Sequence, residues 1–383
     1  MSFLGNKTVN QLNLHYGLHA LATNAGGLFF TVYLLKAGLS APLVMASIAL
    51  ILAGRFCLRP LTLLVGKTWG LKPTLVLGTL AQAVPFLILP QVEGANIYLL
   101  VLCATWALGD ALYWPSYHAY FAALGDAEHR GHQVSAREAI VAATGIIGPI
   151  IGGWALMTLG GKAAFGIAAL IQLACALPLL TGPQVMIAKS VPGAFQTGRM
   201  GFFLLASDGW LCAGLIWVWQ IILFTNMGRS FTAYGGAIAI GALASALAGL
   251  FLGRFVDAGH GRRAAVIAFG VLVITILVRA SATSPAVSVF ASALGALVVC
   301  LYTPTMMTAI YNMSKASPCT LRYHMVTEGG YDLGASLGCL VSAGMIWAGV
   351  PLWTTLLLAL IGALSVMLLQ RRYYATVPAS ATA

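Results

Sequence analysis

Long apolar stretches follow one another along almost the whole chain, separated by short polar segments. Twelve of them reach or approach the ~20 residues that an α-helix needs to cross a bilayer. They are residues 12–36, 42–66, 73–92, 97–122, 139–158, 163–182, 201–226, 231–254, 264–281, 286–312, 326–348 and 351–370. Runs of this length indicate helices, because a helix satisfies its own backbone polar groups in lipid. The pattern predicts an all-α membrane protein with twelve transmembrane helices.

Composition agrees with this prediction. Hydrophobic residues make up 60% of the 383 residues, charged residues make up 8%, and the mean hydropathy is +0.91. A soluble domain carries about 25% charged residues. The net charge of +11 would suit a nucleic-acid partner, but the basic residues fall mainly in alternate loops. The charge therefore indicates membrane topology, and we expect no nucleic-acid partner.

The distribution of basic residues predicts that both termini face the cytoplasm. This side would hold Lys7, Lys67, Lys72, Arg130, Lys189, Arg199, Arg262, Arg263, Lys315, Arg322, Arg371 and Arg372. The opposite loops hold only Lys36, Lys162, Arg229 and Arg279. Residues 1–11 are polar and the first apolar stretch is too long for a signal peptide. We expect a multi-pass protein of a bacterial-type cytoplasmic (inner) membrane, surrounded by the lipid bilayer.

A polar break at residues 183–200 divides the apolar stretches six and six. Three motifs recur across it at separations of 189 to 192 residues. They pair Leu112-Tyr113-x-Pro115 with Leu301-Tyr302-x-Pro304, Arg130-x-His132-x-Val134 with Arg322-x-His324-x-Val326, and Gly38-x-Ser40 with Gly228-x-Ser230. Parallel repeats of six helices are typical of transporters, with the binding site at their interface. The sequence predicts two pseudo-symmetric bundles, residues 1–182 and 201–383, and a cytoplasmic linker at 183–200.

Two motifs make the chain resemble the major facilitator superfamily over essentially its whole length. Residues 253–263, GRFVDAGHGRR, resemble the superfamily's cytoplasmic loop signature, and residues 66–72 repeat its glycines and bases without the acid. Residues 145–153 have the pattern GxxGPxxGG, which resembles the glycine-proline motif of the drug–proton antiporter branch. The same small residues also suit close helix packing. Thr105 stands where that branch usually has an arginine.

Ionisable side chains within a membrane are costly and mark functional pathways. Five of the nine acidic residues fall within or beside the apolar stretches: Asp110, Glu138, Asp208, Glu328 and Asp332. The resemblance implies that helices one, four, seven and ten line a central cavity. Candidate residues of a substrate and proton pathway on these helices are His15, His19, Asp110, Tyr113, Trp114, Tyr117, His118, Asp208, Trp219 and Tyr302.

Asp110 is the leading candidate for a proton carrier. It lies about midway along its helix and shares a face with Tyr113 and Tyr117, which would contact an aromatic substrate. The alternative is a structural aspartate paired with a neighbouring base. His15 and His19 could relay protons or only hydrogen-bond a neighbouring helix. Asp208 could take part in coupling or lie at a solvated mouth.

The resemblance implies that helices two and eleven meet across the interface of the two halves. Each carries a charged pair with i, i+4 spacing, and together the pairs predict a cytoplasmic gate. If these helices are antiparallel, Arg59 would face Glu328 and Arg55 would face Asp332. A second contact would join Asp257 to Arg137. The alternative is that Arg59 snorkels to the headgroups and Arg55 pairs with Asp110.

The sequence as a whole predicts a secondary active transporter that works by alternating access, and not an enzyme. We expect proton-coupled export of a small amphipathic or aromatic compound by a monomer. The alternatives are an importer or lipid flippase of the same fold, or a non-transporting sensor or assembly factor. The chain has no phosphate-binding loop of the Walker type and no C-x-x-C pair. We therefore expect no cofactor and no metal, with a proton gradient as the driving force and Na⁺ left open.

Overall fold

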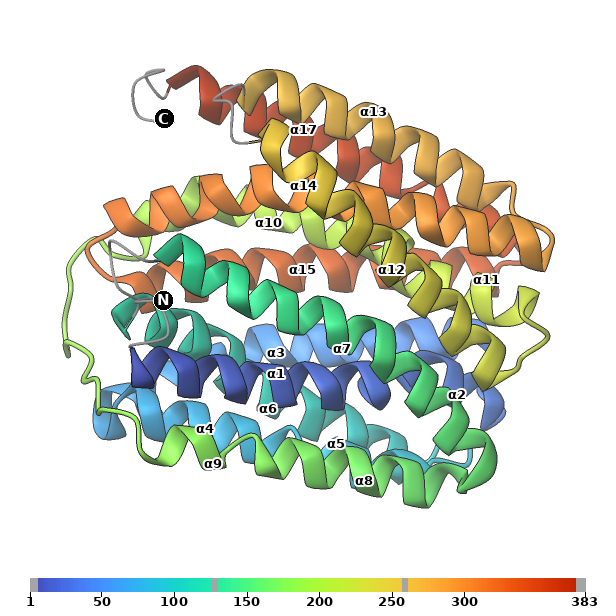
Figure 1. The fold of residues 1–383 in the computed structure, drawn as a ribbon, viewed down its shortest axis with the longest axis horizontal. Coiled ribbons are helices and arrows are strands. Elements are labelled where there is room, and N and C mark those ends of the chain that lie inside the picture. The colour runs from blue at the N-terminus through green and yellow to red at the C-terminus, as the bar shows by residue number, and fades with distance from the viewer. Residues whose placement is uncertain (1–5, 125–129, 257–260, 377–383) are drawn as a thin grey trace.

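The computed structural model describes residues 6–124, 130–256 and 261–376. Most of these residues are helical, and none of them forms a β-strand. Most helices run along the long axis of the molecule (Figure 1). The start of α1 and the end of α17 lie at the same end, which we call the terminal end (Figure 1). The predicted all-α architecture is thus what the described residues form.

Short breaks divide several of the expected spans into more than one helix. The chain before the linker forms α1 (Lys7–Ala25), α2 (Phe30–Lys36), α3 (Ala41–Trp69), α4 (Leu71–Ala81), α5 (Val84–Ile88), α6 (Ile97–Leu124), α7 (Arg130–Thr158), α8 (Gly160–Ala174) and α9 (Leu177–Leu180). After the linker come α10 (Arg199–Cys212), a π-helical turn (Ala213–Val218), α11 (Trp219–Asn226), α12 (Phe231–Val256), α13 (Gly261–Ala280), α14 (Pro285–Ala316), α15 (Thr320–Trp347), α16 (Leu352–Leu356) and α17 (Ala359–Thr376).

Within the described ranges, nine helical segments are long and apolar enough to cross a membrane. They are Lys7–Lys36, Ala41–Trp69, Leu71–Gln91, Ile97–Leu124, Ala139–Thr158, Gly160–Leu180, Gln196–Asn226, Phe231–Ala248 and Leu352–Ala375. Two further apolar helices, Ala265–Ala280 and Pro285–Ala296, are shorter. Helix α15 is a continuous helix of 28 residues, but charged side chains such as Glu328 and Asp332 interrupt its apolar sequence. The predicted number of twelve spans is not confirmed, and the two pseudo-symmetric bundles stay a prediction.

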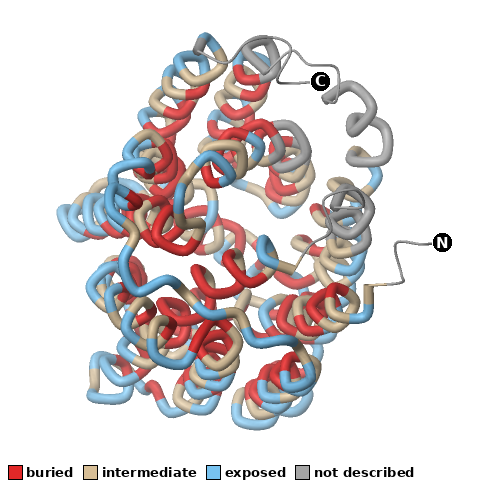
Figure 2. Tube along the Cα trace, turned by 90° about the vertical axis from the view of Figure 1, so that its left-hand side faces the viewer, coloured by how far each residue is buried: buried red, intermediate tan, exposed pale blue. Residues whose placement is uncertain are grey.

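The outer faces of the helices are largely apolar, whereas several charged side chains are buried inside the molecule. Large apolar side chains lie on the outer faces of the helices, among them Leu64, Leu100, Ile150, Trp154, Leu170, Ile240, Phe290, Leu337 and Leu368. Exposed stretches follow the outer turns of the helices, whereas buried stretches face the centre (Figure 2). Arg55, Arg59 and Asp332 are each less than 9% exposed. This distribution suits lipid as the surrounding medium.

Glycines allow α15 to lie directly against α10. A Cβ atom on Gly334 would stand 1.9 Å from the Ala206 carbonyl oxygen, and one on Gly209 would stand 2.2 Å from the Tyr331 carbonyl oxygen. Backbones can approach this closely only where no side chain separates them. The contact fixes the height of α15 relative to α10.

Replacing Gly334 with leucine should therefore separate α10 from α15. We expect a loss of several kcal/mol, because the new side chain cannot be accommodated without moving the backbone of Ala206. Thermal unfolding of the purified protein in detergent measures this. Gly344→Leu on the same helix is the control, because a Cβ there meets nothing within 4 Å. Equal melting temperatures for the two variants would contradict the close contact.

The most extensive contacts between the part before the linker and the part after it are made by two helix pairs. Helix α3 packs against α15, where Ser336 donates a hydrogen bond of 2.9 Å to the Ala49 carbonyl oxygen. Helix α7 packs against α12, where a Cβ on Gly235 would stand 2.2 Å from the Pro149 carbonyl oxygen. The glycine-proline motif of residues 145–153 thus forms close helix contacts, as its small residues allow.

Candidate functional site

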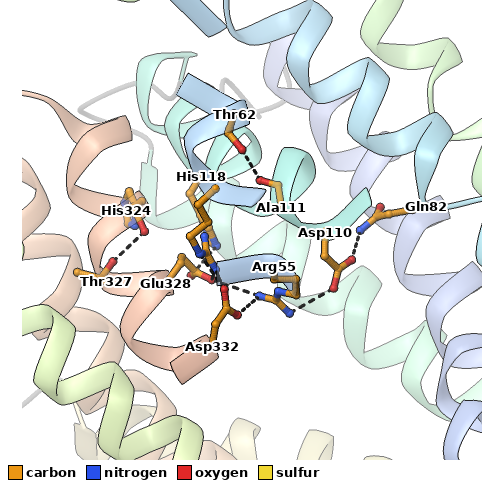
Figure 3. Close-up of polar contacts among 11 residues, drawn as sticks. Arg55, Thr62, Gln82, Asp110, Ala111, His118, His324, Thr327, Glu328 and Asp332 are labelled. Carbon is orange, nitrogen blue, oxygen red and sulfur yellow. Dashed lines mark hydrogen bonds and ion pairs between the residues drawn. The ribbon is translucent and has the colours of Figure 1, made fainter. Parts of the chain in front are cut away.

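A cluster of five charged side chains joins α3, α6 and α15 (Figure 3). Arg55 Nη1 lies 3.2 Å from Asp110 Oδ2, and Arg55 Nη2 lies 3.0 Å from Asp332 Oδ1. Arg59 binds Asp332 Oδ2 through Nε at 2.8 Å and Nη2 at 2.5 Å. The Asp332 side chain is completely buried, and each of its oxygens faces a guanidinium group, Oδ1 that of Arg55 and Oδ2 that of Arg59.

Glu328 is the loosest member of the cluster. Its Oε2 atom lies 3.8 Å from Arg55 Nη2 and 3.7 Å from Arg59 Nη2, and its Oε1 atom lies 3.9 Å from His118 Nε2. These distances are beyond good hydrogen bonds. Its side chain is also 18% exposed. Glu328 can therefore change partners more easily than Asp332 can.

The structure contains both predicted contacts, Arg55 with Asp332 at 3.0 Å and Arg59 with Glu328 at 3.7 Å, but not as separate pairs. Arg59 lies closer to Asp332 than to Glu328. Arg55 also binds Asp110, which was the alternative. Long, flexible arginine side chains let two guanidinium groups reach one buried carboxylate, so the helix register does not force separate pairs. Arg59 is only 4% exposed and does not snorkel. Of the second predicted contact, Asp257 lies outside the described residues, and the Arg137 guanidinium stands 5.3 Å from the ring centres of Tyr16 and Phe121.

The net charge of the cluster indicates that it can bind a proton. Two guanidinium groups, Arg55 and Arg59, face three carboxylates, so the ionised cluster carries a net charge of 2 − 3 = −1. One bound proton would make it neutral. A buried site gains stability when its net charge is removed, because burying charge in a medium of low dielectric constant is costly. The arrangement is suited to binding one proton.

A chain of hydrogen bonds extends from the cluster to α1. Gln82 Nε2 donates to Asp110 Oδ1 at 2.7 Å, and Gln172 Nε2 donates to Gln82 Oε1 at 3.1 Å. The Gln172 Oε1 atom is then left to accept from His19 Nδ1, 3.1 Å away. Because the carboxylate of Asp110 only accepts when ionised, it sets the direction of both amides. This series of hydrogen bonds therefore places the proton of the neutral His19 ring on Nδ1.

His15 takes part in a separate contact on α1. Its Nδ1 atom lies 2.7 Å from the Cys175 carbonyl oxygen, which can only accept, so His15 donates there. Its Nε2 atom, 3.0 Å from Tyr113 Oη, then accepts the tyrosine hydroxyl. His15 therefore bridges α6 and the end of α8 in its neutral form.

Replacing Gln82 with leucine should break the chain between Asp110 and α1. The change removes the donor to Asp110 Oδ1 and one of the two acceptors of Gln172, which keeps only the 3.3 Å bond to the Thr79 carbonyl oxygen. Leaving buried polar groups without partners costs about 1–3 kcal/mol each. We expect a lower melting temperature in detergent. Gln91→Leu, at an exposed position, is the matched control. Equal melting temperatures of the two variants would contradict the series of hydrogen bonds from Asp110 to His19.

The aromatic side chains of α6 pack against α1 more than they face open space. Tyr113 and Tyr117 are fully buried, with Tyr113 4.5 Å from the His19 ring and Tyr117 4.8 Å from the Tyr16 ring, centre to centre. The expectation that they contact substrate is therefore not supported by their positions. Trp114 does line a cavity of about 100 Å³, together with His19, Gln82, Trp106 and Asp110. His118 stacks on His324 at 5.3 Å, beside the charged cluster.

A larger cavity of 580 Å³ lies mainly between α10, the π-helical turn, α11, α12 and α14. Its size is that of a small-molecule site. Three predicted residues line it, Asp208, Trp219 and Tyr302. Tyr302 Oη donates a hydrogen bond of 2.6 Å to Asp208 Oδ1. Arg279 also lines this cavity, although the sequence placed it only among the loop charges.

Sequence reasoning missed Gln82, Gln172 and Arg279. The two glutamines are neutral and are embedded in apolar stretches, where an amide gives no charge signal. Their rarity within such stretches was the available signal, because a buried amide must find hydrogen-bond partners. Arg279 was counted among the loop charges, and its position at the wall of the cavity was not predicted.

The fold and this buried ionic site define a polytopic helical membrane protein. A sequence model of the Major Facilitator Superfamily matches residues 12–225, and the chain belongs to this superfamily. No curated protein sequence matches the chain.

Three solved structures with a similar fold are those of transporters. A mutant of the nucleoside transporter NupG matches with a TM-score of 0.66 at 14% identity, covering 97% of this chain and 100% of that one. The POT family transporter PepTSo matches with a TM-score of 0.68 at 10% identity, covering 97% and 99%. An auto-inhibited POT family peptide transporter matches with a TM-score of 0.67 at 12% identity, covering 95% and 97%. These likenesses show the fold.

Proposed function

We propose that the protein is a proton-coupled secondary transporter that exports a small amphipathic or aromatic compound by alternating access. The observation that carries the proposal is the cluster of Arg55, Arg59, Asp110, Glu328 and Asp332. It joins α3 and α6 to α15 across the contact between the two parts of the chain, and it is one proton short of neutrality.

The cluster offers a physical link between a proton and the conformation. The ion pairs of Asp332 with Arg55 and Arg59 hold α3 against α15. Separating them would leave buried charges without partners, which is strongly unfavourable. Proton binding to a carboxylate of the cluster weakens its attraction to the arginines and lowers that barrier. A substrate that binds one of the two conformations more tightly is then coupled to the proton by linkage.

The orientation in the membrane follows from the positive-inside rule. The terminal end carries the helix ends and loops with Lys67, Lys72, Lys189, Lys315 and Arg371. We propose that this end is cytoplasmic in a bacterial-type inner membrane. The charged cluster then lies nearer the cytoplasm than the 580 Å³ cavity does. The export direction is supported by the resemblance of residues 145–153 to the antiporter motif.

Transport by vesicles of known orientation tests the proposal. Inverted membrane vesicles with an acidic interior would be given ethidium, 4-aminohippurate, uridine or dialanine, each radiolabelled. We expect uptake of at least one aromatic amphipathic compound that collapses when a protonophore is added. Uptake driven by Na⁺ alone would overturn proton coupling. Uptake only in right-side-out vesicles would make the protein an importer, and no uptake with any compound would favour a non-transporting role.

A further inference from the structure

Arg279 is a buried cation that no acidic side chain neutralises within the described ranges. It lies in the last turn of α13 and is 8% exposed. Its Nη1 atom donates to the Leu215 carbonyl oxygen at 2.7 Å, and its Nε atom lies 3.5 Å from the Ala291 carbonyl oxygen. None of the described ion pairs includes it. A buried guanidinium held only by neutral groups is costly.

The surroundings of Arg279 hold its guanidinium at the cavity wall. Leu215 belongs to the π-helical turn, and its carbonyl oxygen accepts the hydrogen bond from Arg279 Nη1. The guanidinium carbon stands 4.8 Å from the centre of the Trp219 ring, which is a favourable distance for a cation–π contact. A Cβ atom on Gly295 would stand 2.0 Å from Nη2, so glycine there leaves room for the guanidinium. The Leu215 carbonyl oxygen, the Trp219 ring and the space left by Gly295 therefore all fix the position of the Arg279 guanidinium.

The cavity beside Arg279 has room for a ligand. Trp219, Gln220, Arg279 and Ser292 line the same 580 Å³ space as Asp208. Asp208 precedes Leu215 by seven residues, which corresponds to roughly 10 Å along a helix. It is bound to Tyr302 and forms no described ion pair with Arg279. The Nη2 group makes no hydrogen bond among the described contacts and lies against Gly295, which lines the same cavity.

We propose that Arg279 binds the acidic group of the transported compound, which is therefore an aromatic or amphipathic organic acid. A carboxylate would supply the charge that Arg279 lacks and would form charge-assisted hydrogen bonds with it. The Trp219 ring beside the guanidinium would contact the apolar part of the same ligand. The proposal rests on the proposed transport function, and it adds the charge and the place of the substrate.

Binding without a gradient tests the site separately from transport. The full chain in nanodiscs would be titrated with 4-aminohippurate and with its neutral methyl ester, using thermal stabilisation as the signal. We expect the acid to bind more tightly than the ester by roughly 10- to 100-fold, the value of charged hydrogen bonds. Equal affinities, or no binding of the acid, would overturn the proposal. This comparison needs no variant.

Variants of Arg279 and Gly295 test whether the preference for the acid depends on the Arg279 guanidinium. Arg279→Gln should reduce affinity for the acid to that for the ester, whereas Lys162→Gln, which removes an exposed charge, should change neither. Arg279→Gln could also loosen the π-helical turn, so Gly295→Ala provides a second variant that keeps the charge and displaces the guanidinium. Weaker acid binding with an unchanged melting temperature is the expected result. Unchanged acid binding in Gly295→Ala and in a folded Arg279→Gln would mean that Arg279 only braces the turn.

The two proposals can fail independently. Selective acid binding that depends on Arg279, without proton-driven uptake of the acid into vesicles, would support the site and overturn the coupling. Proton-driven uptake of ethidium or uridine that is unaffected by Arg279→Gln would support transport and overturn the acidic substrate class.

Discussion

Replacing Asp110 with asparagine is expected to abolish gradient-driven accumulation of substrate while the protein stays folded and binds substrate. The change leaves two cations and two acids in the cluster, 2 − 2 = 0, so no proton is needed for neutrality. Asparagine keeps the shape and can still accept from Gln82. Accumulation in proteoliposomes under an imposed pH gradient should fall to the level found without a gradient.

Two further variants make this result decisive. Glu328→Gln also gives a neutral cluster and should lose coupling as Asp110→Asn does, because either change removes the same excess charge. Glu93→Gln removes an exposed acid outside the cluster and should leave accumulation unchanged. Uphill accumulation retained in Asp110→Asn would move the proton site to Asp208, the other buried acid on a cavity wall.

Reversing the charge of Arg59 should separate α3 from α15 at the terminal end. Arg59→Glu removes two hydrogen bonds to Asp332 and puts like charges together in a buried site. Breaking a buried ion pair costs about 3–5 kcal/mol, which shifts the equilibrium toward separation by roughly 10²- to 10³-fold. Spin labels at the exposed positions Thr68 and Ala316, in a background without native cysteines, would report a longer distance.

A second substitution discriminates between the partners of Arg59. The distances favour Asp332, at 2.5 Å, over Glu328, at 3.7 Å. Adding Asp332→Arg to Arg59→Glu should therefore restore the short distance between the labels more fully than adding Glu328→Arg. The reverse ranking would revive the one-to-one pairing that the sequence suggested. No lengthening in the single variant would mean that this cluster does not close the terminal end.

Spacing within the sequence identified the charged cluster but not its connections. The resemblance implied that α3 and α15 face each other, and their i, i+4 pairs of opposite charge indicated an ionic contact between them. Helix periodicity says nothing about which of two neighbouring carboxylates a long arginine side chain will reach. Asp110 on a third helix enters the same cluster, and only the packing of α6 against α3 brings it there.

The aromatic face of α6 shows that helix periodicity predicts which residues share a face but not what that face contacts. Periodicity placed Tyr113 and Tyr117 on one face, and the structure has them on that face. A shared face can meet another helix as well as a cavity, and here α1 covers it. Arg279 shows the converse, since a basic residue at a helix end is expected to reach the headgroups but here turns inward. The all-α fold of this superfamily needed only the apolar stretches and is confirmed.

The glycine contacts between α10 and α15 determine which parts can move together. Because Gly209 and Gly334 bring the two backbones into contact, α15 cannot slide along α10 without a steric clash. Any displacement that frees Asp332 from the arginines must then carry α10 as well, and with it Asp208 and one wall of the large cavity. We therefore expect α10 and α15 to move as one rigid unit, so that a change of charge in the cluster also moves the wall of the cavity that carries Asp208.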